Sequence, residues 1–489
     1  MIDLSLKFNK THPIVIFFVF LILILSNTTT ANFCIDNSEN LVIKPQKINK
    51  KELIPIENKI VHIHANSFYD YGYKVGELIL FNKTLNLFFR ALVNHINKKN
   101  RTENLEIHKY APFYNEMLNG FSDRLKITLN QALLLQDQIS KSLNSEACTI
   151  TLSTGPATKN NETFLSQNFD NDPLSSLIWF IGLSRIFYIA HIENYYSYSF
   201  IGIPIFLECR ILNEKGLGWG GNWICLNKTR PVDTGKGMFI YELELRTMLG
   251  CSTVDEVEDL YRNTNRSSGR NTFPDFGPRQ SDNAANGYCD SNGGILVMEQ
   301  MHSYFIAQNE TSTNVPGLEK LQLSNKLYHP PGILWHTNHH MWLDPMLTGS
   351  VLPKGYSSSE LRANRCKELL ENNYGDIDLK VIKNITKDHG KGFIANQPDS
   401  GDICRHSDKY GNGTTMFAWI VEPKKLTIHM TNGRPCCFPY KSYDFTDDFE
   451  EGESQISISQ NLMKGKFLYE TTLINSLLKN QVLPNNDFF

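Results

Sequence analysis

Cys148 is the side chain of this sequence with the clearest capacity for covalent chemistry. It stands in ACTITLS at 147–153, beside Thr149, and the next short run, FLSQNFD at 164–170, ends in Asp170. A thiol becomes an effective nucleophile when a base takes its proton. That base could be a His elsewhere in the chain, or the α-amine of Cys148 itself if the chain is cut before it, since an α-amine has a lower pKa than a lysine. The alternative is a buried thiol or half of a disulfide.

Three other patterns invite a cofactor interpretation, and each lacks what the cofactor needs. HTNHH at 336–340 contains three imidazoles, but no Glu lies between them as in the zinc motif HExxH. The alternate histidines of VHIHA at 61–65 are typical of a structural strand face. GLGWGGN at 216–222 lacks the GxGxxG spacing of a nucleotide loop, and we interpret it as a tight turn between strands. We therefore expect no metal and no other cofactor.

The first 31 residues resemble a targeting segment. Lys7 and Lys10 precede the apolar run IVIFFVFLILIL, and small polar residues follow as far as Ala31. This order predicts a signal peptide at 1–31 that is cleaved after Ala31. The apolar run is shorter than the roughly 20 residues that span a bilayer, so a retained membrane anchor is the weaker interpretation.

The composition fits a glycosylated protein of the secretory pathway. Eight sequons follow the leader, at Asn82, Asn100, Asn161, Asn227, Asn265, Asn309, Asn384 and Asn412. The formal charge of -3 gives no indication of a nucleic-acid partner, and 41% hydrophobic residues can form a large core. The ten cysteines match neither a CxxC pair nor a dense disulfide scaffold.

Helices are expected before Cys148 and mainly strands after it. Apolar residues recur at helical spacing over 69–99 and 110–140. Beyond Cys148 the chain contains short β-rich runs separated by polar residues, Gly or Pro, with helical patterns at 239–263, 358–373 and 456–479. Strands in hairpin-like pairs with grouped helices predict an α+β layered domain.

Several segments together resemble a known family. ACTITLS and FLSQNFD are similar to the start of the catalytic chain in the isopenicillin-N/acyl-CoA:6-aminopenicillanic acid acyltransferase family of N-terminal-nucleophile cysteine hydrolases. Further similar segments follow in the family's order over roughly 61–446: EKGLGWGGNWI, ANGYCDSNGGILVMEQ, LWHTNHH, SSSELRANRCKELL, DICRHSD and TTMFAWIVEPKKLTIHMTNGRPC.

The resemblance implies roles for individual residues. Autocleavage would occur between Ala147 and Cys148, and the freed α-amine of Cys148 would act as its base. Asp170 would hold that amine or the pocket, and Asn338 would donate to the oxyanion. Further pocket candidates are Thr149, Asn168, Asn222 and Arg405.

Two departures from the family pattern bear on these roles. The family usually has Gly before the nucleophile, where a strained backbone favours an N-to-S acyl shift, and this chain has Ala147. Its penicillin-forming member has a basic residue before the last hairpin, where this chain has Asn412, itself in a sequon. Arg405 is the nearest Arg.

The resemblance implies a four-layer αββα N-terminal-nucleophile hydrolase sandwich. We expect a signal peptide at 1–31, a lead-in at 32–60, a helical N-terminal chain at 61–147, a catalytic chain at 148–446 and a helical extension at 447–489. The expected activity is that of a self-processing amidohydrolase or acyltransferase for carbon–nitrogen bonds other than peptide bonds. It would work through an acyl-enzyme on Cys148, with hydrolysis favoured over transfer.

Two alternatives remain open. One is a lipid amidase of the acid-ceramidase type, and the other is an inactive secreted binding glycoprotein with the same fold, which Ala147 favours. We expect the protein to be secreted or to lie in a lysosome-like or other secretory-pathway lumen. Its partners would be a small-molecule amide, a possible acyl donor and its own second fragment in a two-chain heterodimer, with no nucleic acid and no stable membrane insertion.

Overall fold

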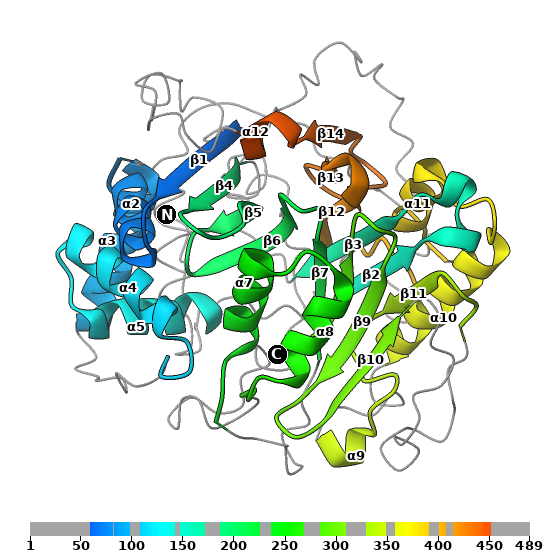
Figure 1. Cartoon of the computed structure of the whole chain (residues 1–489), viewed down its shortest axis with the longest axis horizontal. Helices are drawn as coiled ribbons and strands as arrows, with labels where there is room; N and C mark the ends of the chain where they lie inside the picture. Colours follow the sequence, from blue (N-terminus) through cyan, green and yellow to red (C-terminus); the bar gives the residue numbers. More distant parts are fainter. Residues whose placement is uncertain are drawn as a thin grey trace, which may run out of the picture.

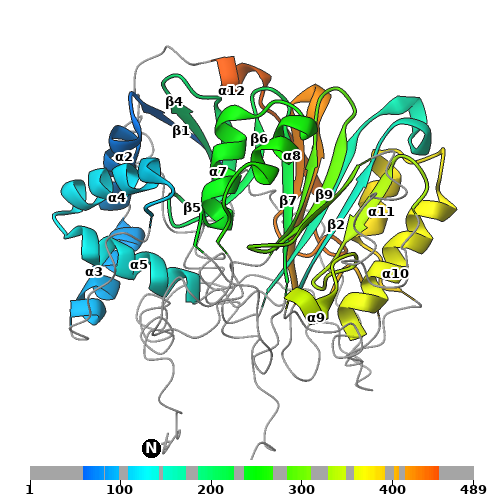
Figure 2. The same ribbon diagram turned by 60° about the horizontal axis from the view of Figure 1, so that its bottom comes forward.

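A computed structural model defines two β-sheets that are packed face to face, with helices on both outer faces (Figures 1 and 2). The structure describes residues 59–81, 83–97, 108–141, 147–171, 186–224, 236–267, 284–309, 329–348, 357–390, 401–406 and 414–450. The predicted signal peptide and the helical pattern at 456–479 lie outside these residues. Within them, no helix combines the length and apolar character needed to cross a bilayer.

The larger sheet has eight strands. In spatial order they are β1 (Lys59–Ala65), β4 (Ile186–Ile192), β5 (Tyr198–Ile203), β6 (Leu207–Asn213), β7 (Gly218–Trp223), β8 (Ala284–Cys289), β9 (Ile295–Gln300) and β10 (Phe305–Asn309). Only the β1–β4 pair is parallel. Antiparallel neighbours follow one another along the chain, as the hairpin-like runs predicted.

The smaller sheet has six strands and contains Cys148. In spatial order they are β11 (Ile333–His336), β2 (Ala147–Ser153), β3 (Phe164–Asn171), β12 (Thr414–Glu422), β13 (Thr427–Thr431) and β14 (Tyr440–Asp444). Strand β2 pairs with β3 over its full length and with β11 at Ile150–Ser153, so Cys148 lies just before the part of β2 that is paired on both sides.

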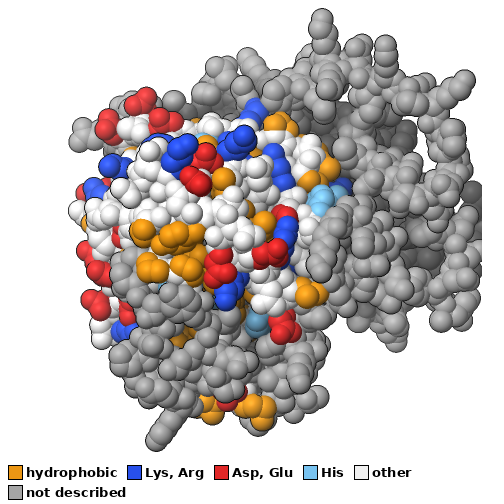
Figure 3. All heavy atoms as spheres, turned by 90° about the vertical axis from the view of Figure 1, so that its right-hand side faces the viewer, with side chains coloured by type: hydrophobic (Ala, Val, Ile, Leu, Met, Phe, Trp, Pro, Cys, Tyr) orange, Lys and Arg blue, Asp and Glu red, His pale blue; other side chains and the backbone are white. Residues whose placement is uncertain are grey.

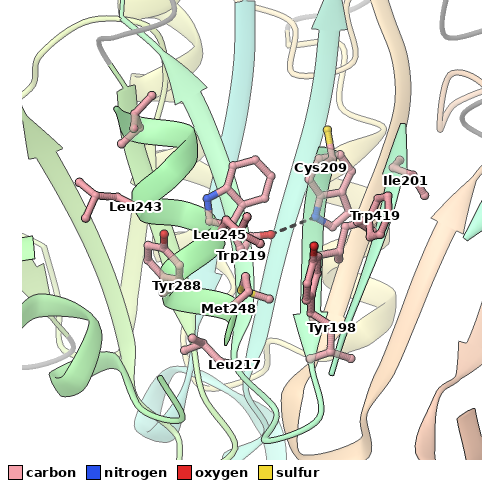
Figure 4. Close-up of a cluster of buried hydrophobic side chains, with 14 of the residues drawn as sticks. Tyr198, Ile201, Cys209, Leu217, Trp219, Leu243, Leu245, Met248, Tyr288 and Trp419 are labelled. Atoms are coloured by element: carbon pink, nitrogen blue, oxygen red, sulfur yellow. Dashed lines mark hydrogen bonds between the residues drawn. The ribbon is translucent and has the colours of Figure 1, made fainter. Parts of the chain in front are cut away.

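Glycines on β7 allow the two sheets to approach closely. A Cβ at Gly220 would lie 3.0 Å from Ile150 and 2.8 Å from Gln167 of the smaller sheet. The indole nitrogen of Trp419 donates to the Trp219 carbonyl across the same interface at 3.3 Å (Figure 4). The prediction of a tight turn at 216–222 is therefore wrong for most of these residues. Residues 218–223 form a central strand, and its glycines leave room for the other sheet.

Helices complete the four layers. The outer face of the larger sheet is covered by α7 (Ile240–Gly250) and α8 (Val254–Arg262), and that of the smaller sheet by α10 (Ser357–Asn372) and α11 (Leu379–Thr386) (Figure 2). Short helices α9 (Pro345–Thr348) and α12 (Thr446–Glu450) and the 3₁₀ turns Gly155–Ala157, Lys159–Asn161 and Pro423–Lys425 lie between the larger elements. The α+β class and its αββα layering are thus confirmed.

The segment before Cys148 forms part of the same core. It contributes β1 and the helices α2 (Phe68–Phe81), α3 (Lys83–Asn97), α4 (Pro112–Leu125) and α5 (Leu129–Lys141), so each long helical pattern of the sequence is a pair of helices. Tyr71 of α2 donates to buried Glu208 of β6 at 3.0 Å. A second buried contact is made by His108. Its Nε2 lies 3.0 Å from Oε1 of Gln136 on α5, and its Nδ1 bonds Glu242 of α7.

The helices on the smaller sheet form one face of the molecule. Side chains of both signs are scattered over this face, with no dominant charge (Figure 3). Beneath this face, Arg362 of α10 bonds the Cys148 carbonyl, and Asn168 of β3 bonds the carbonyl of Thr386 on α11.

Candidate active site

Cys148 is the second residue of β2 and is buried, with 1% of its surface exposed. In the register of the sheet it lies opposite Phe169 of β3. Alternate residues of a strand share a face, so its thiol is on the side of Ile150, which packs against the larger sheet. The thiol therefore faces the space between the two sheets.

The backbone of Cys148 is held at both of its polar atoms. Its nitrogen donates to Oδ1 of Asn338 at 2.7 Å, and its carbonyl oxygen accepts from Nη1 of Arg362 at 2.6 Å. Arg362 is fully buried, and its Nη2 also donates to Oδ1 of Asn338 at 2.8 Å. Because a guanidinium can only donate, Arg362 fixes which end of the Asn338 amide faces Cys148.

The two ends of the Asn338 amide bond different strands. Nδ2 donates to the carbonyl of Trp223 on β7 at 2.9 Å. In this arrangement Asn338 is an acceptor for the Cys148 nitrogen. A role as oxyanion donor, as the resemblance implies, would use the second N–H of Nδ2, because an amide nitrogen carries two.

A buried carboxylate positions the segment that carries Asn338. Oxygens of Glu299 on β9 bond His336 Nε2 at 2.9 Å and His340 Nδ1 at 3.1 Å. Burial alone would raise the pKa of Glu299, but His340 and His336 outweigh it and hold this pKa well below its usual range. These two histidines of HTNHH bind a carboxylate.

Hydrogen bonds from two directions complete the support of Asn338. Glu299 also accepts from the backbone nitrogens of the residues that follow the motif, Met341, Trp342 and Leu343. From the side of α10, Oγ of Ser359 accepts the Asn338 N–H at 2.7 Å. The carboxamide is therefore anchored through its own backbone as well as through Arg362.

Asp170 lies beside the predicted cleavage point. It pairs with Ala147 in the register of β2 and β3, and its Oδ1 accepts from Thr415 Oγ1 at 2.6 Å. Burial raises the pKa of Asp170 to about 6, against the opposing effect of the charges of Arg405 and Arg362. An acid with this pKa changes charge in the mildly acidic range.

Asp170 should make the uncut chain more stable at acidic pH. Its pKa is about 6 when folded and has a reference value of 3.8, so the folded state binds the proton more tightly. The stabilisation is fully present below about pH 4 and is lost as the pH rises through about 6, with a magnitude of ~3 kcal/mol. We expect urea unfolding of Cys148→Ala, compared with Cys148→Ala/Asp170→Asn, to show this change in the difference between their stabilities. A difference that is constant from about pH 4 to 7 would contradict the assignment.

The other pocket candidates fall into two groups. Thr149 accepts from Arg362 at 2.8 Å, on the face of β2 opposite the thiol. Asn168 donates to the carbonyls of Thr386 and Ile403, both at 2.9 Å, and so braces α11 and the segment 401–406. The positive charge of Arg405 lowers the pKa of Asp170. These three residues lie on the outer side of the smaller sheet, away from the thiol.

Asn222 lies on the thiol side of the interface. It is fully buried on β7, and neither atom of its amide has a hydrogen-bond partner among the described residues. Gly220, two residues earlier on the same face, meets Ile150, and Asn338 links the next residue, Trp223, to Cys148. A buried amide without a partner costs about 1–3 kcal/mol, so a ligand that bonded it would recover this cost.

Aromatic rings continue from Cys148 along the inner face. Phe169, opposite Cys148, stacks on Phe417 of β12 with ring centroids 4.9 Å apart. Phe417 stacks in turn on Trp419. The indole nitrogen of Trp419 reaches the Trp219 carbonyl of the larger sheet (Figure 4). The surroundings of the thiol are therefore apolar on this side.

Sequence reasoning did not identify Arg362, Glu299 or Ser359 as site residues. Arg362 and Ser359 lie in SSSELRANRCKELL, and Glu299 is the next-to-last residue of ILVMEQ, so both segments were noted for their resemblance and not for these side chains. An Arg inside a helix and a Glu at the end of a strand are ordinary surface patterns, and only their complete burial marks them as unusual.

A large open pocket of the structure lies elsewhere. Its volume is about 630 Å³, and it is lined by residues of α7, α8 and the chain around them, including Arg246, Glu256 and Asp259. Neither Asn338 nor Arg362, which bond the Cys148 backbone, lines it. We therefore do not assign it to the chemistry of Cys148.

No family model and no curated protein matches the chain. Similar solved structures include a mutant of conjugated bile acid hydrolase from Clostridium perfringens, with 14% identity and a TM-score of 0.33 over 62% of this chain and 93% of that one. Penicillin V acylase from Agrobacterium tumefaciens has 10% identity and a TM-score of 0.33 over 61% and 86%. A further variant of the same bile acid hydrolase has 13% identity and a TM-score of 0.28 over 63% and 90%. At this level of similarity we draw no conclusion from these structures.

Proposed function

We propose that the protein is a self-processing cysteine amidohydrolase whose nucleophile is Cys148. The observation that carries this proposal is the binding of the Cys148 nitrogen by Asn338, itself fixed by Arg362. The Asn–Arg pair would hold this nitrogen in place once the cut has made it an α-amine, as a general base requires.

Self-processing would begin with attack of the Cys148 thiol on the carbonyl carbon of Ala147. The C–N bond between the two residues breaks, the carbonyl passes to sulfur as a thioester, and the nitrogen takes the thiol proton. Water then hydrolyses the thioester, leaving a carboxylate on Ala147, a thiol and a free α-amine. Arg362 holds the Cys148 carbonyl throughout, so the new N-terminus stays in place.

Amide hydrolysis would use the same atoms. The α-amine takes the thiol proton, the thiolate attacks the substrate carbonyl, and the departing amine takes the proton back. Asn338 accepts one N–H of the α-amine and so directs its lone pair, while Asn222 has the free donor that the oxyanion requires. Water completes the cycle by releasing the acid.

The surroundings of the thiol favour an apolar acyl group. Phe169 and Phe417 lie on the inner face beside Cys148, and Arg362, which bonds the Cys148 carbonyl, lies on the opposite face. N-acyl amino acids and N-acyl amines with aromatic or alkyl acyl groups are therefore the substrate class that we propose. A lipid amide is the second candidate, for the same apolar reason.

We also propose that the protein is made on the secretory pathway and is glycosylated. The predicted leader and the sequons support this, and Asn161, Asn265 and Asn384 are exposed in the structure. Asn309 is half-buried, while Asn82, Asn100, Asn227 and Asn412 lie outside the described residues.

The direct test is to trap the acyl-enzyme. The processed protein is incubated with a panel of N-acyl p-nitroanilides, quenched in acid, digested and analysed by mass spectrometry. We expect the acyl mass on the peptide that begins at Cys148, together with release of p-nitroaniline. Asn222→Ala should lower kcat by roughly 100-fold or more with little change in KM if it binds the oxyanion. A processed protein that acquires no acyl group from any member of the panel would favour the inactive binding-glycoprotein alternative.

A further inference from the structure

We propose that His389, Cys404, His406 and Cys436 form a structural metal site of the zinc type. One ligand atom from each of these side chains lies within 4.8 Å of every other. Cys436 Sγ is 3.4 Å from His406 Nε2 and shares a hydrogen bond with His389. The rings of His389 and His406 are nearly perpendicular, at 86°, with centroids 4.9 Å apart.

These distances are close to those of a tetrahedral centre. Zinc bonds thiolate sulfur at about 2.3 Å and imidazole nitrogen at about 2.0 Å, which places neighbouring ligand atoms roughly 3.3–3.8 Å apart. The Cys436–His406 distance of 3.4 Å is already in this range, and no separation in the group, all within 4.8 Å, needs to shorten by more than about 1 Å. Two sulfur and two nitrogen donors are a set that zinc prefers.

Metal binding would change the hydrogen bonds of two ligands. Arg434 now lies 2.5 Å from His406 Nδ1 and donates to it. When Nε2 of His406 binds the metal, its proton moves to Nδ1 and Arg434 turns away. Each thiol releases one proton, so binding of Zn²⁺ by two neutral imidazoles and two thiolates leaves a neutral centre and releases two protons.

The four ligands come from three segments of the chain. His389 follows α11, Cys404 and His406 lie in the segment 401–406, and Cys436 lies in the turn between β13 and β14. The backbone of Cys404 is bonded to Asp388 at 2.9 Å. A metal with four protein ligands has no open position for substrate, so its role here is to join these segments.

The proposed metal site lies next to residues that act on Asp170. Arg405 stands between two of the ligands, and its charge acts on Asp170. Its backbone nitrogen and oxygen both bond Thr415, whose hydroxyl also donates to Asp170. The metal would therefore fix the position from which Arg405 and Thr415 act on Asp170. The inference departs from the sequence-based expectation of no metal, because the four ligands are spread over 389–436 without a regular spacing.

The test measures metal in full-length protein without a histidine tag, secreted from a eukaryotic host and dialysed against metal-free buffer. We expect about one zinc per chain by plasma mass spectrometry, both in the wild type and in Cys148→Ala, so the result does not depend on self-processing or catalysis. Cys404→Ser and Cys436→Ser should each retain less than about 0.1 zinc per chain. Cys437→Ser is the matched control, since its sulfur is 3.5 Å from that of Cys436 but is not among the four ligands, and it should keep the metal.

A second measurement covers the case in which the serine variants do not fold. Wild-type protein stripped by a chelator and loaded with Co²⁺ should show a thiolate-to-cobalt charge-transfer band and a higher Tm than the stripped protein. The proposal is overturned if the wild type holds no zinc and takes up no cobalt. It is also overturned if a peptide map without reductant finds a disulfide from Cys404 or Cys436, which an oxidising compartment could form instead.

Discussion

Replacing Cys148 by Ala will leave the protein as a single chain, whereas the wild type will give two chains after removal of glycans. The larger wild-type chain will begin with Cys-Thr-Ile-Thr, because the proposed cut lies between Ala147 and Cys148. Amide hydrolysis by the variant will fall by at least about 1,000-fold, since both the nucleophile and the free amine are lost. Denaturing electrophoresis with N-terminal sequencing of each band measures the cut, and p-nitroaniline release measures activity.

Cys209→Ser is the matched control for this variant. Cys209 is a buried thiol of β6 close enough to Cys148 for each to affect the other electrostatically. It bonds none of the atoms at the cleavage point, so its variant should still be cut. Folded wild-type protein that remains one chain would remove the free amine and with it the catalytic proposal.

The two wild-type chains should remain together under native conditions. Strand β1 of the shorter chain pairs with β4 of the longer one over seven residues, and the buried contact between Tyr71 and Glu208 joins them beneath. Native size-exclusion chromatography should therefore give one peak that contains both chains. The cut removes one peptide bond and none of these contacts.

The sequence was informative wherever local pattern decides structure. Helical spacing predicted α7, α8 and α10 close to their observed bounds, and alternation predicted β1, β2 and β3. It failed at β7, because glycines usually indicate turns and only the facing sheet explains why a central strand needs them.

The residues of the candidate site also divide into those that the sequence predicted and those that it did not. Cys148, Asp170 and Asn338 could be selected from short motifs, and the structure places all three around the start of β2. Arg362 is 214 positions from Cys148 along the chain, and its buried bond to the Cys148 carbonyl follows from the packing of α10 on the sheet. No local pattern encodes that contact, so the residue that orients Asn338 became visible only in three dimensions.

Glu299→Gln should be among the most damaging conservative changes in the protein. The carboxylate accepts from His336, from His340 and from three consecutive backbone nitrogens. A glutamine amide keeps one oxygen and places two N–H donors against groups that are themselves donors, and it leaves the histidines without their counter-charge. We expect a loss of about 3–5 kcal/mol in the free energy of unfolding, measured by urea denaturation of the uncut Cys148→Ala background.

The same change should also slow processing of the protein that does fold, because Asn338 lies between the two histidines. Glu242→Gln separates this effect from general instability. Glu242 is a buried carboxylate bonded to His108 and to the Phe239 nitrogen at 2.8 Å, in the contact between the N-terminal helices and α7. Both variants should be destabilised, but when the cut is followed at a temperature where each is folded, only Glu299→Gln should be slow. If the two were cut at equal rates per folded molecule, Glu299 would support the fold alone and would not position Asn338.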